Sequence, residues 1–228
     1  MKQISLLFSI GVLLCLISCA PGTKGDQKAE DLNLATPYNI MMVRHGVSDY
    51  ATFKTVYMAH DSVRKAYGLE SLAVGRGMDD PNMIIVMNKI SDVQKAKDFA
   101  ASPSLKEAMM KAGITGPPTV EFMNVIRDDT TSIPQNDRVM VSHHVKDFDA
   151  WVKVYDAEGK ATRAANGIVD RGMARGIDDP NMVYLLFAVT DMAKANARMQ
   201  SEELKKVMTD AGVDSAPSFF KFTWDTSK

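Results

Sequence analysis

Residues 77–83 read Gly-Met-Asp-Asp-Pro-Asn-Met, and residues 176–182 read Gly-Ile-Asp-Asp-Pro-Asn-Met. The second stretch lies 99 positions after the first, and the similarity continues on both sides of it. Identical residues recur at this spacing in the pairs Arg64 and Arg163, Arg76 and Arg175, Asp92 and Asp191, Ser102 and Ser201, and Gly113 and Gly212. Upstream the spacing becomes 98, which aligns His45 with His143 and Tyr57 with Tyr155. The chain therefore contains one module of about 90 residues twice, and a module of this length is a domain or half of one.

The residue pattern within a copy predicts the element order β-α-β-β-α-β. In the first copy, apolar and β-prone runs predict strands over residues 38–47, 69–77, 83–90 and 118–126. Asp49 and Asp92 each precede a segment with apolar residues at helical spacing, so both are expected to be helix N-caps. Ser102 or Ser104 is expected to cap a further short helix that ends at Gly113. This order is that of the ferredoxin-like split βαβ arrangement, an antiparallel sheet with both helices on one face.

The free face of each sheet needs a cover. Residues 40–47 and 83–86 are apolar at consecutive positions, as expected when both faces of a sheet are buried. The simplest cover is the sheet of the other copy. The sequence thus predicts an α+β fold in which two tandem ferredoxin-like repeats, at 38–126 and 137–224, form one pseudo-dimeric α/β barrel. The polar stretch 127–136 is expected to link them.

The first residues differ from the rest of the chain. Lys2 precedes an apolar run from Ile4 to Ile17, which is typical of a signal peptide and too short to span a bilayer. The run ends in Leu-Ile-Ser-Cys19, which resembles the lipobox of bacterial lipoproteins. We expect a signal peptide at 1–18, lipidation of Cys19 after cleavage, and a flexible tether at 19–37. This predicts a lipid-anchored protein of the bacterial cell envelope, with the choice between inner and outer membrane left open.

Composition narrows the possible functions. The 228 residues carry a formal charge of −1 with both signs mixed along the chain, so no basic surface is expected for nucleic acid. Cys15 and Cys19 are the only cysteines, and Cys15 lies in the predicted signal, so the exported part is expected to have no disulfide. Neither a glycine-rich nucleotide-binding motif, nor Gly-x-Ser-x-Gly, nor Cys-x-x-Cys is present. Nucleotide, serine-hydrolase and thiol-redox functions are therefore not expected.

Three sequence motifs resemble a known superfamily. They are His-x-Val-x-Asp-[Tyr/Phe]-x-x-[Phe/Trp]-x-x-x-Tyr from His45 and His143, the shared Asp-Asp-Pro-Asn-Met, and Ala-Gly-[Ile/Val]-x-x-[Pro/Ala]-Pro from Ala112 and Ala211. Together they resemble the dimeric α/β-barrel superfamily, and within it the antibiotic-biosynthesis monooxygenases. That resemblance implies a ferredoxin-like barrel and a mixed set of activities: some members are cofactor-independent oxygenases and some handle haem. The Asn, Trp and His arrangement of the haem-degrading members does not map onto either copy, so no cofactor is expected.

His45 and His143 are the candidate catalytic residues. Each lies on a strand face with flanking valines, so each is expected to be buried or half-buried. Two roles are open: a general base in a barrel cavity, or a hydrogen-bonded core residue that holds the next loop. Gly46 occupies the position in the first copy that corresponds to His144 in the second, so the two copies have diverged here. If only one cavity is active, we expect it in the second half.

The candidate ligand-binding residues are His144, Arg76, Arg175, Tyr57, Tyr155 and Trp151. The two arginines precede the repeated turn and could meet an anionic ligand at the barrel mouth, or be solvated strand ends. The aromatic side chains lie on the apolar face of the first helix and serve either core packing or ligand stacking. No metal site is expected, because adjacent histidines point to opposite faces and the Asp-Asp pairs have turn chemistry.

Three classes of function remain. The leading expectation is a protein that binds a small apolar or aromatic molecule in the barrel, and the chain has 16 methionines, many of which would make an adaptable interior. The second is a cofactor-independent monooxygenase in which His45 or His143 deprotonates a phenolic or enolic substrate. The third is a non-catalytic module that binds another protein. Pairing of two chains into a homo-oligomer stays open in all three.

Overall fold

The computed structural model describes residues 37–227, and their strands and helices follow the predicted order. The first half contains β1 (Tyr38–Val47), α1 (Tyr50–Ala59), α2 (Asp61–Ala66), β2 (Leu69–Gly77), β3 (Met83–Ile90), α3 (Val93–Ala100), α4 (Pro103–Lys111) and β4 (Ile114–Asp128). The second half contains β5 (Asp137–His144), α5 (Phe148–Glu158), α6 (Lys160–Ala165), β6 (Ile168–Gly176), β7 (Met182–Val189), α7 (Met192–Met199), α8 (Glu202–Asp210) and β8 (Ser218–Trp224).

The eight strands close into one antiparallel barrel. Each half contributes a four-stranded sheet, β4-β1-β3-β2 from the first and β8-β5-β7-β6 from the second. The sheets meet at two seams, where β2 pairs with β8 and β4 pairs with β6. The order 4-1-3-2 within each half is that of the split βαβ arrangement. The predicted fold class, two ferredoxin-like repeats that form a pseudo-dimeric α/β barrel, is confirmed.

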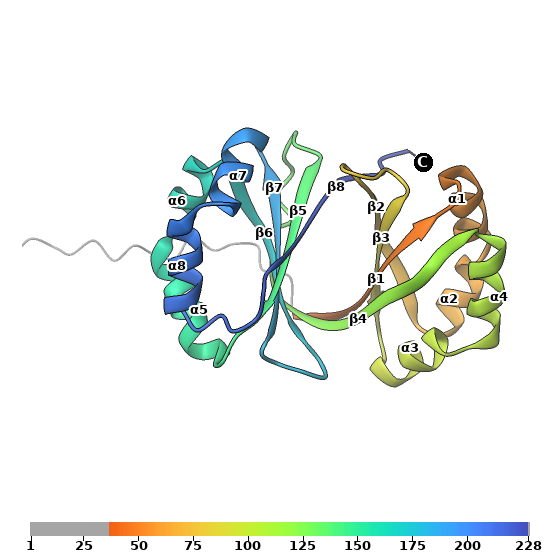
Figure 1. Cartoon of the computed structure of the whole chain (residues 1–228). Helices are drawn as coiled ribbons and strands as arrows, with labels where there is room; N and C mark the ends of the chain where they lie inside the picture. Colours follow the sequence, from red (N-terminus) through yellow and green to blue (C-terminus); the bar gives the residue numbers. More distant parts are fainter. Residues whose placement is uncertain (1–36, 228) are drawn as a thin grey trace, which may run out of the picture. The chain divides into compact units, whose positions relative to one another are not determined.

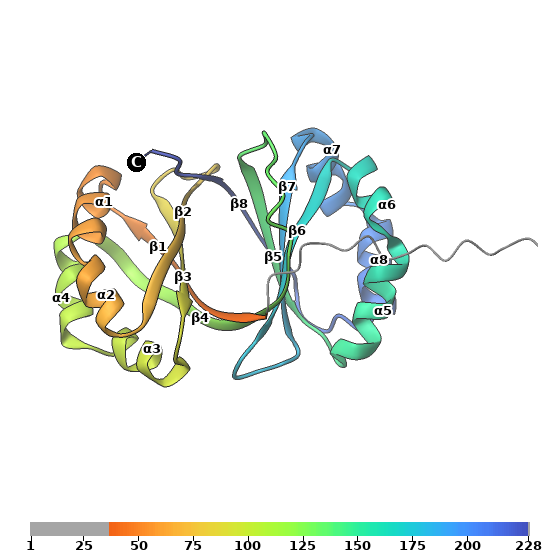
Figure 2. The ribbon, with the colours of Figure 1, turned by 180° about the vertical axis from the view of Figure 1, so that it is seen from behind.

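The helices cover the outside of the barrel. Helices α1–α4 lie over the first sheet and α5–α8 over the second (Figure 1), and the view from behind shows the same arrangement (Figure 2). Strand β1 alternates between the two faces, as a pleated strand must: Met41 packs with Phe99 of α3, whereas Met42 packs inside the barrel with Met123. Every strand thus has one face toward helices and one toward the other sheet, which explains the consecutive apolar residues.

The barrel interior is filled by side chains. Its buried cluster consists of Ile40, Met42, Ile85, Met87, Met123, Val125, Met140, Ala174, Tyr184 and Phe222. At Gly75 the backbone of β2 comes so close to Phe222 of β8 that an added Cβ atom would lie 2.5 Å from its ring. The expectation of a ligand held inside the barrel is therefore corrected: apolar side chains from both sheets occupy that space, and the pockets described below lie elsewhere.

Most of the predicted helix boundaries agree with the structure. The side chains of Asp49, Asp92 and Ser102 accept hydrogen bonds from backbone N–H groups three residues later, at 2.7, 2.9 and 3.2 Å. Ser102, and not Ser104, is thus the cap of α4. The first helical segment differs from the prediction, because it breaks at His60 into α1 and α2.

The chain between the halves is shorter than the sequence suggested, because β4 extends to Asp128 and so includes the first two residues assigned to the linker. Cys19, the predicted signal peptide and nearly all of the predicted tether lie outside the described residues. Among residues 37–227, none of the helices combines the length and the apolar character needed to cross a bilayer.

Candidate functional site

Each half contains a pocket between its sheet and its helices. The first has a cavity of about 100 Å³ and the second a cavity of about 90 Å³. Their linings come from corresponding elements: the outer face of the first strand of each half, the two helical segments that follow it, and the two helices before the last strand. The pseudo-symmetry of the fold thus produces two related pockets on opposite sides of the barrel.

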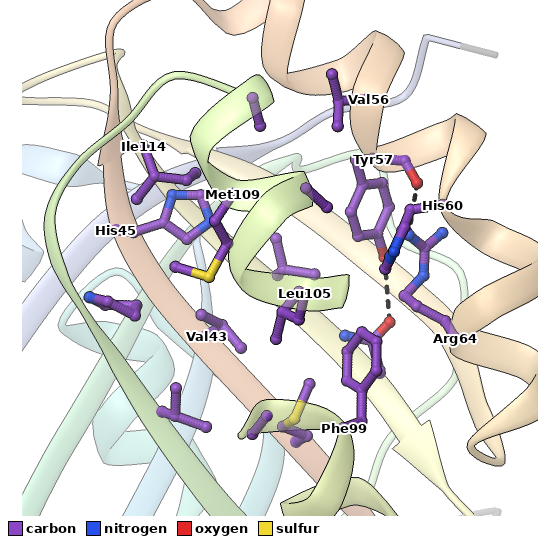
Figure 3. A pocket seen from close by; sticks show the side chains of 18 of the residues that line it. Val43, His45, Val56, Tyr57, His60, Arg64, Phe99, Leu105, Met109 and Ile114 are labelled. Carbon is purple, nitrogen blue, oxygen red and sulfur yellow. Dashed lines mark hydrogen bonds between the residues drawn. The ribbon is translucent and has the colours of Figure 1, made fainter. Parts of the chain in front are cut away.

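The two candidate catalytic histidines each lie in one of these pockets. His45 lines the first and His143 the second, together with Tyr57 in the first and both Tyr155 and Trp151 in the second. Figure 3 shows the first pocket, with His45 of β1 and Met109 of α4 on one side and Tyr57 and Arg64 on the other. The structure therefore brings five of the sequence-predicted site residues into two equivalent places.

Both histidines are buried without a full set of hydrogen bonds. His143 is 3% exposed, and neither its Nδ1 nor its Nε2 has a hydrogen-bond partner. His45 is 6% exposed, and its Nδ1 is unpaired. Their rings pack edge-on against Trp151 and Phe53, at centroid distances of 5.5 and 5.3 Å. A buried polar group without a partner costs roughly 1–3 kcal/mol, so these side chains are not explained by packing alone.

Burial also sets the charge of the two rings. Loss of solvation lowers the pKa of His143 from 6.5 to about 4. The pKa of His45 is lowered too, mainly by burial. Both imidazoles are therefore neutral near pH 7, and each offers one N–H donor and one nitrogen acceptor. Neutral rings of this kind can bind a hydroxyl or carbonyl group in an apolar pocket.

A buried arginine frames each pocket from the second helical segment. Arg64 in the first half and Arg163 in the second stack over Tyr57 and Tyr155, with guanidinium-to-centroid distances of 3.7 and 3.9 Å. Arg163 also donates two hydrogen bonds to Asp170, both 2.7 Å long. These contacts hold the tyrosine rings as pocket walls, and burial raises the pKa of both tyrosines. The hydroxyl of Tyr57 additionally donates to Asn88 Oδ1 at 3.1 Å.

Arg76 and Arg175 do not reach the pockets. Each donates from Nε to the carbonyl of the turn proline, Arg76 to Pro81 at 3.1 Å and Arg175 to Pro180 at 2.6 Å. Each guanidinium also covers an aromatic ring of the first helix of its half, at 4.2 and 3.9 Å. Their conserved spacing between the repeats is explained by the turn that they brace. The expectation that they meet an anionic ligand is not supported by these contacts.

His144 also lies apart from the second pocket. Its Nδ1 is 2.6 Å from Asp214 Oδ1, and its Nε2 is 3.5 Å from Asp179 Oδ2. The hydrogen bond with Asp214 raises the pKa of this ring, in contrast to that of His143. Within residues 37–227, no three His, Cys, Asp or Glu side chains converge as a metal site.

The pocket residues missed by sequence reasoning include Arg64, Asn88 and Phe99 in the first pocket, and Glu158, Arg163 and Arg198 in the second. Phe99 and Arg198 occupy the same position of the repeat, 99 residues apart. The sequence therefore did contain a signal: at this position an aromatic residue of the first copy corresponds to an arginine of the second.

Comparisons with known proteins place the fold but not the activity. No family model matches the chain, and no curated protein matches it. A candidate monooxygenase from Lactobacillus acidophilus is similar in structure, with a TM-score of 0.50, 16% identity, and coverage of 84% of this chain and 95% of that one. A candidate monooxygenase from Fusobacterium nucleatum gives a TM-score of 0.52, 12% identity, and coverage of 83% and 93%.

An anthrone oxidase-like protein is similar as well, with a TM-score of 0.54, 12% identity, and coverage of 82% of this chain and 91% of that one. In all three cases the similarity extends over most of both chains. At these identities it establishes a shared ferredoxin-like α/β fold and no particular reaction. The chain is thus an α+β protein with the fold of monooxygenase-like ferredoxin-fold proteins.

Proposed function

We propose that this protein binds a small, largely apolar molecule in each pocket between sheet and helices, with His45 and His143 hydrogen-bonding to a hydroxyl or carbonyl group of that molecule. The observation that carries the proposal is the pair of unpaired nitrogens of His143 in an apolar cavity. A ligand oxygen at this place would satisfy a group whose burial otherwise costs free energy. The neutral state of both rings suits an uncharged polar group.

The size of the pockets limits the ligand. The cavity volumes given above are the space that the centre of a water molecule can occupy, and roughly 10–15 Å³ of such space is needed for each water molecule. The first cavity, of about 100 Å³, therefore holds on the order of seven to ten water-sized groups. That corresponds to one substituted ring or a short branched chain. Larger molecules would have to extend out of the pocket.

Capture of a bound compound tests this proposal. The purified chain is incubated with a metabolite extract and washed, and retained compounds are identified by mass spectrometry. We expect a compound of about one ring that carries a hydroxyl or carbonyl group, and weaker retention by the His143→Phe variant. The matched control is His144→Gln, which changes the adjacent histidine outside the pocket and should retain as much as the wild type. Retention of nothing, at concentrations where micromolar ligands persist, would refute small-molecule binding and favour the protein-binding module.

Cofactor-independent oxygenation is a second candidate function, favoured by the structural similarity to candidate monooxygenases and to an anthrone oxidase-like protein. In that reaction His45 or His143 would take a proton from a phenolic or enolic substrate. A base with a pKa of about 4 opposes this step, because a phenol has a pKa of about 10 and the gap corresponds to about 8 kcal/mol. Oxygen uptake by the protein with its retained compound, lost in the His143→Phe variant, would establish the reaction.

We also propose that Cys19 carries lipid and anchors the pockets at a membrane of the cell envelope. The support is the lipobox-like Leu-Ile-Ser-Cys19 after an apolar run. Each acyl methylene buried in a bilayer adds about 0.8 kcal/mol, so more than one acyl chain would hold the protein firmly. Metabolic labelling with a fatty acid should label the wild type and not Cys19→Ser, and label on both would contradict the assignment.

A further inference from the structure

The two pockets differ at one edge. In the first half this edge is aromatic: the ring of Phe99 lies 5.9 Å from that of His60 and 5.4 Å from that of Tyr67. In the second half the corresponding edge is polar. It consists of Glu158, Asn166 and Arg198, which all line the second cavity. Asn166 and Arg198 stand 99 positions after Tyr67 and Phe99, and Glu158 ends the helix whose counterpart ends next to His60.

Arg198 is a buried cation with one partner that it can exchange. Its side chain is 8% exposed, and its Nη2 donates to Glu158 Oε1 at 2.8 Å. Its Nη1 lies 3.1 Å from Glu203 Oε2, and the Glu203 side chain is 79% exposed. An ion pair with so exposed a carboxylate contributes little, because water solvates that carboxylate almost as well when it leaves. A ligand carboxylate that reached Nη1 from the cavity would be shielded from water and would bind more strongly.

Arg163, the other buried arginine of the second pocket, is held by partners within the protein at each of its three nitrogens. Arg163 donates from Nε and Nη2 to Asp170 and from Nη1 to the carbonyl of Tyr155 at 2.9 Å. Two guanidinium groups and the carboxylates of Glu158 and Asp170 therefore balance one another inside the protein. If a ligand carboxylate replaces Glu203, the balance of charge among these four groups is unchanged. Arg198 is thus the group at which an anion fits.

The pseudo-symmetry of the two halves places Arg198 and His143 toward opposite ends of the second pocket. In the first half, Phe99 packs with Met41 at the start of the outward face of β1, whereas His45 contacts Phe53 nearer the end of that strand. Their counterparts on β5 are Val139 and His143, four residues apart, which corresponds to about 13 Å along a strand. Both polar side chains line the second cavity, and so do the apolar residues Val141 and Leu185, so a ligand that spans this distance would meet a polar group at each end and an apolar wall between them.

We propose that the second pocket binds an anionic ligand, an aromatic or short-chain carboxylic acid whose carboxylate replaces Glu203 on Arg198 and whose hydroxyl or carbonyl oxygen bonds with His143. The first pocket, with Phe99 in place of the arginine, takes an uncharged ligand. This inference rests on the proposed function and adds the charge class of each ligand. It also gives the two halves different specificities within one barrel.

Paired probes test the charge preference. Isothermal titration of the purified chain compares 4-hydroxyphenylacetate with its uncharged amide, 4-hydroxyphenylacetamide. We expect the second pocket of the wild type to bind the acid about tenfold or more tightly than the amide, the effect of one charge-assisted hydrogen bond. The double variant Glu158→His/Arg198→Phe installs the residues of the first pocket and should lose this preference. Glu203→Gln removes the competing carboxylate at an exposed site and should strengthen binding of the acid but not of the amide.

The outcomes separate this inference from the proposed function. An acid-to-amide preference that is unchanged in both variants overturns the inference, even if both probes bind. Failure of the wild type to bind the acid at millimolar concentration also overturns the inference. The proposed function is then still tested separately, by whether the capture experiment yields a bound compound. Loss of the preference in the double variant, together with tighter acid binding by Glu203→Gln, supports the assignment of Arg198.

Discussion

Replacement of His143 by phenylalanine should change the pH dependence of stability. The folded protein holds the pKa of this ring at about 4, whereas the unfolded chain has the ordinary value of 6.5. Between these values the unfolded state binds a proton and the folded state does not, so unfolding becomes easier as the pH falls. At about 1.4 kcal/mol per pH unit, the wild type should lose about 3 kcal/mol between pH 7 and pH 4 through this one residue.

Urea unfolding at half-unit steps from pH 7.5 to pH 4 measures the effect. The difference in unfolding free energy between His143→Phe and wild type should grow by about 3 kcal/mol over that range. At pH 7 the variant should already be more stable by roughly 1–3 kcal/mol, because an apolar ring of similar shape replaces an unpaired polar one. Parallel curves for the two proteins would refute the reasoning, since they would mean that His143 has a partner or solvent access that the structure does not show.

His144→Gln should act in the opposite direction. The raised pKa of the His144 ring contributes stability at low pH that is lost as the pH rises through the folded value. The free energy of unfolding of the variant should therefore fall below that of the wild type only on the acid side. Arg163→Gln should cost about 3 kcal/mol in the same assay at pH 7, since it leaves the half-buried carboxylate of Asp170 without its arginine partner. Ser102→Ala should cost about 1 kcal/mol through loss of the cap of α4, whereas Ser104→Ala should change the free energy of unfolding by less than about 0.5 kcal/mol.

Much of the fold could be predicted because local signals agreed with the repeat. Asp49, Asp92 and Ser102 are caps in the structure for the reason that they predict caps in a sequence: each side chain can accept a hydrogen bond from the N–H group three residues later. The break at His60 was not predicted, although the spacing of the repeat changes from 98 to 99 in this region. In the second half the corresponding break is at Gly159, where φ is +80°, a conformation that favours glycine.

The location of the pockets could not be predicted from residue patterns. Consecutive apolar residues show that both faces of a strand are buried, but they do not show which face packs completely. Met42 and Met41 are neighbours with the same side chain, yet one fills the barrel and the other lines the first pocket. The role of Arg198 depends on which partners reach it across helices, and no local sequence pattern contains that information.

The number and place of bound molecules test the central claim most directly. Native mass spectrometry of the purified chain, saturated with the compounds that it retains, counts ligands on the wild type, on His45→Phe and His143→Phe, and on the double variant. If the histidines hold ligands in the two pockets between sheet and helices, each single variant loses occupancy of its own pocket and the double variant retains none. Unchanged occupancy of the double variant would contradict the account, because the ligand would then bind elsewhere on the protein.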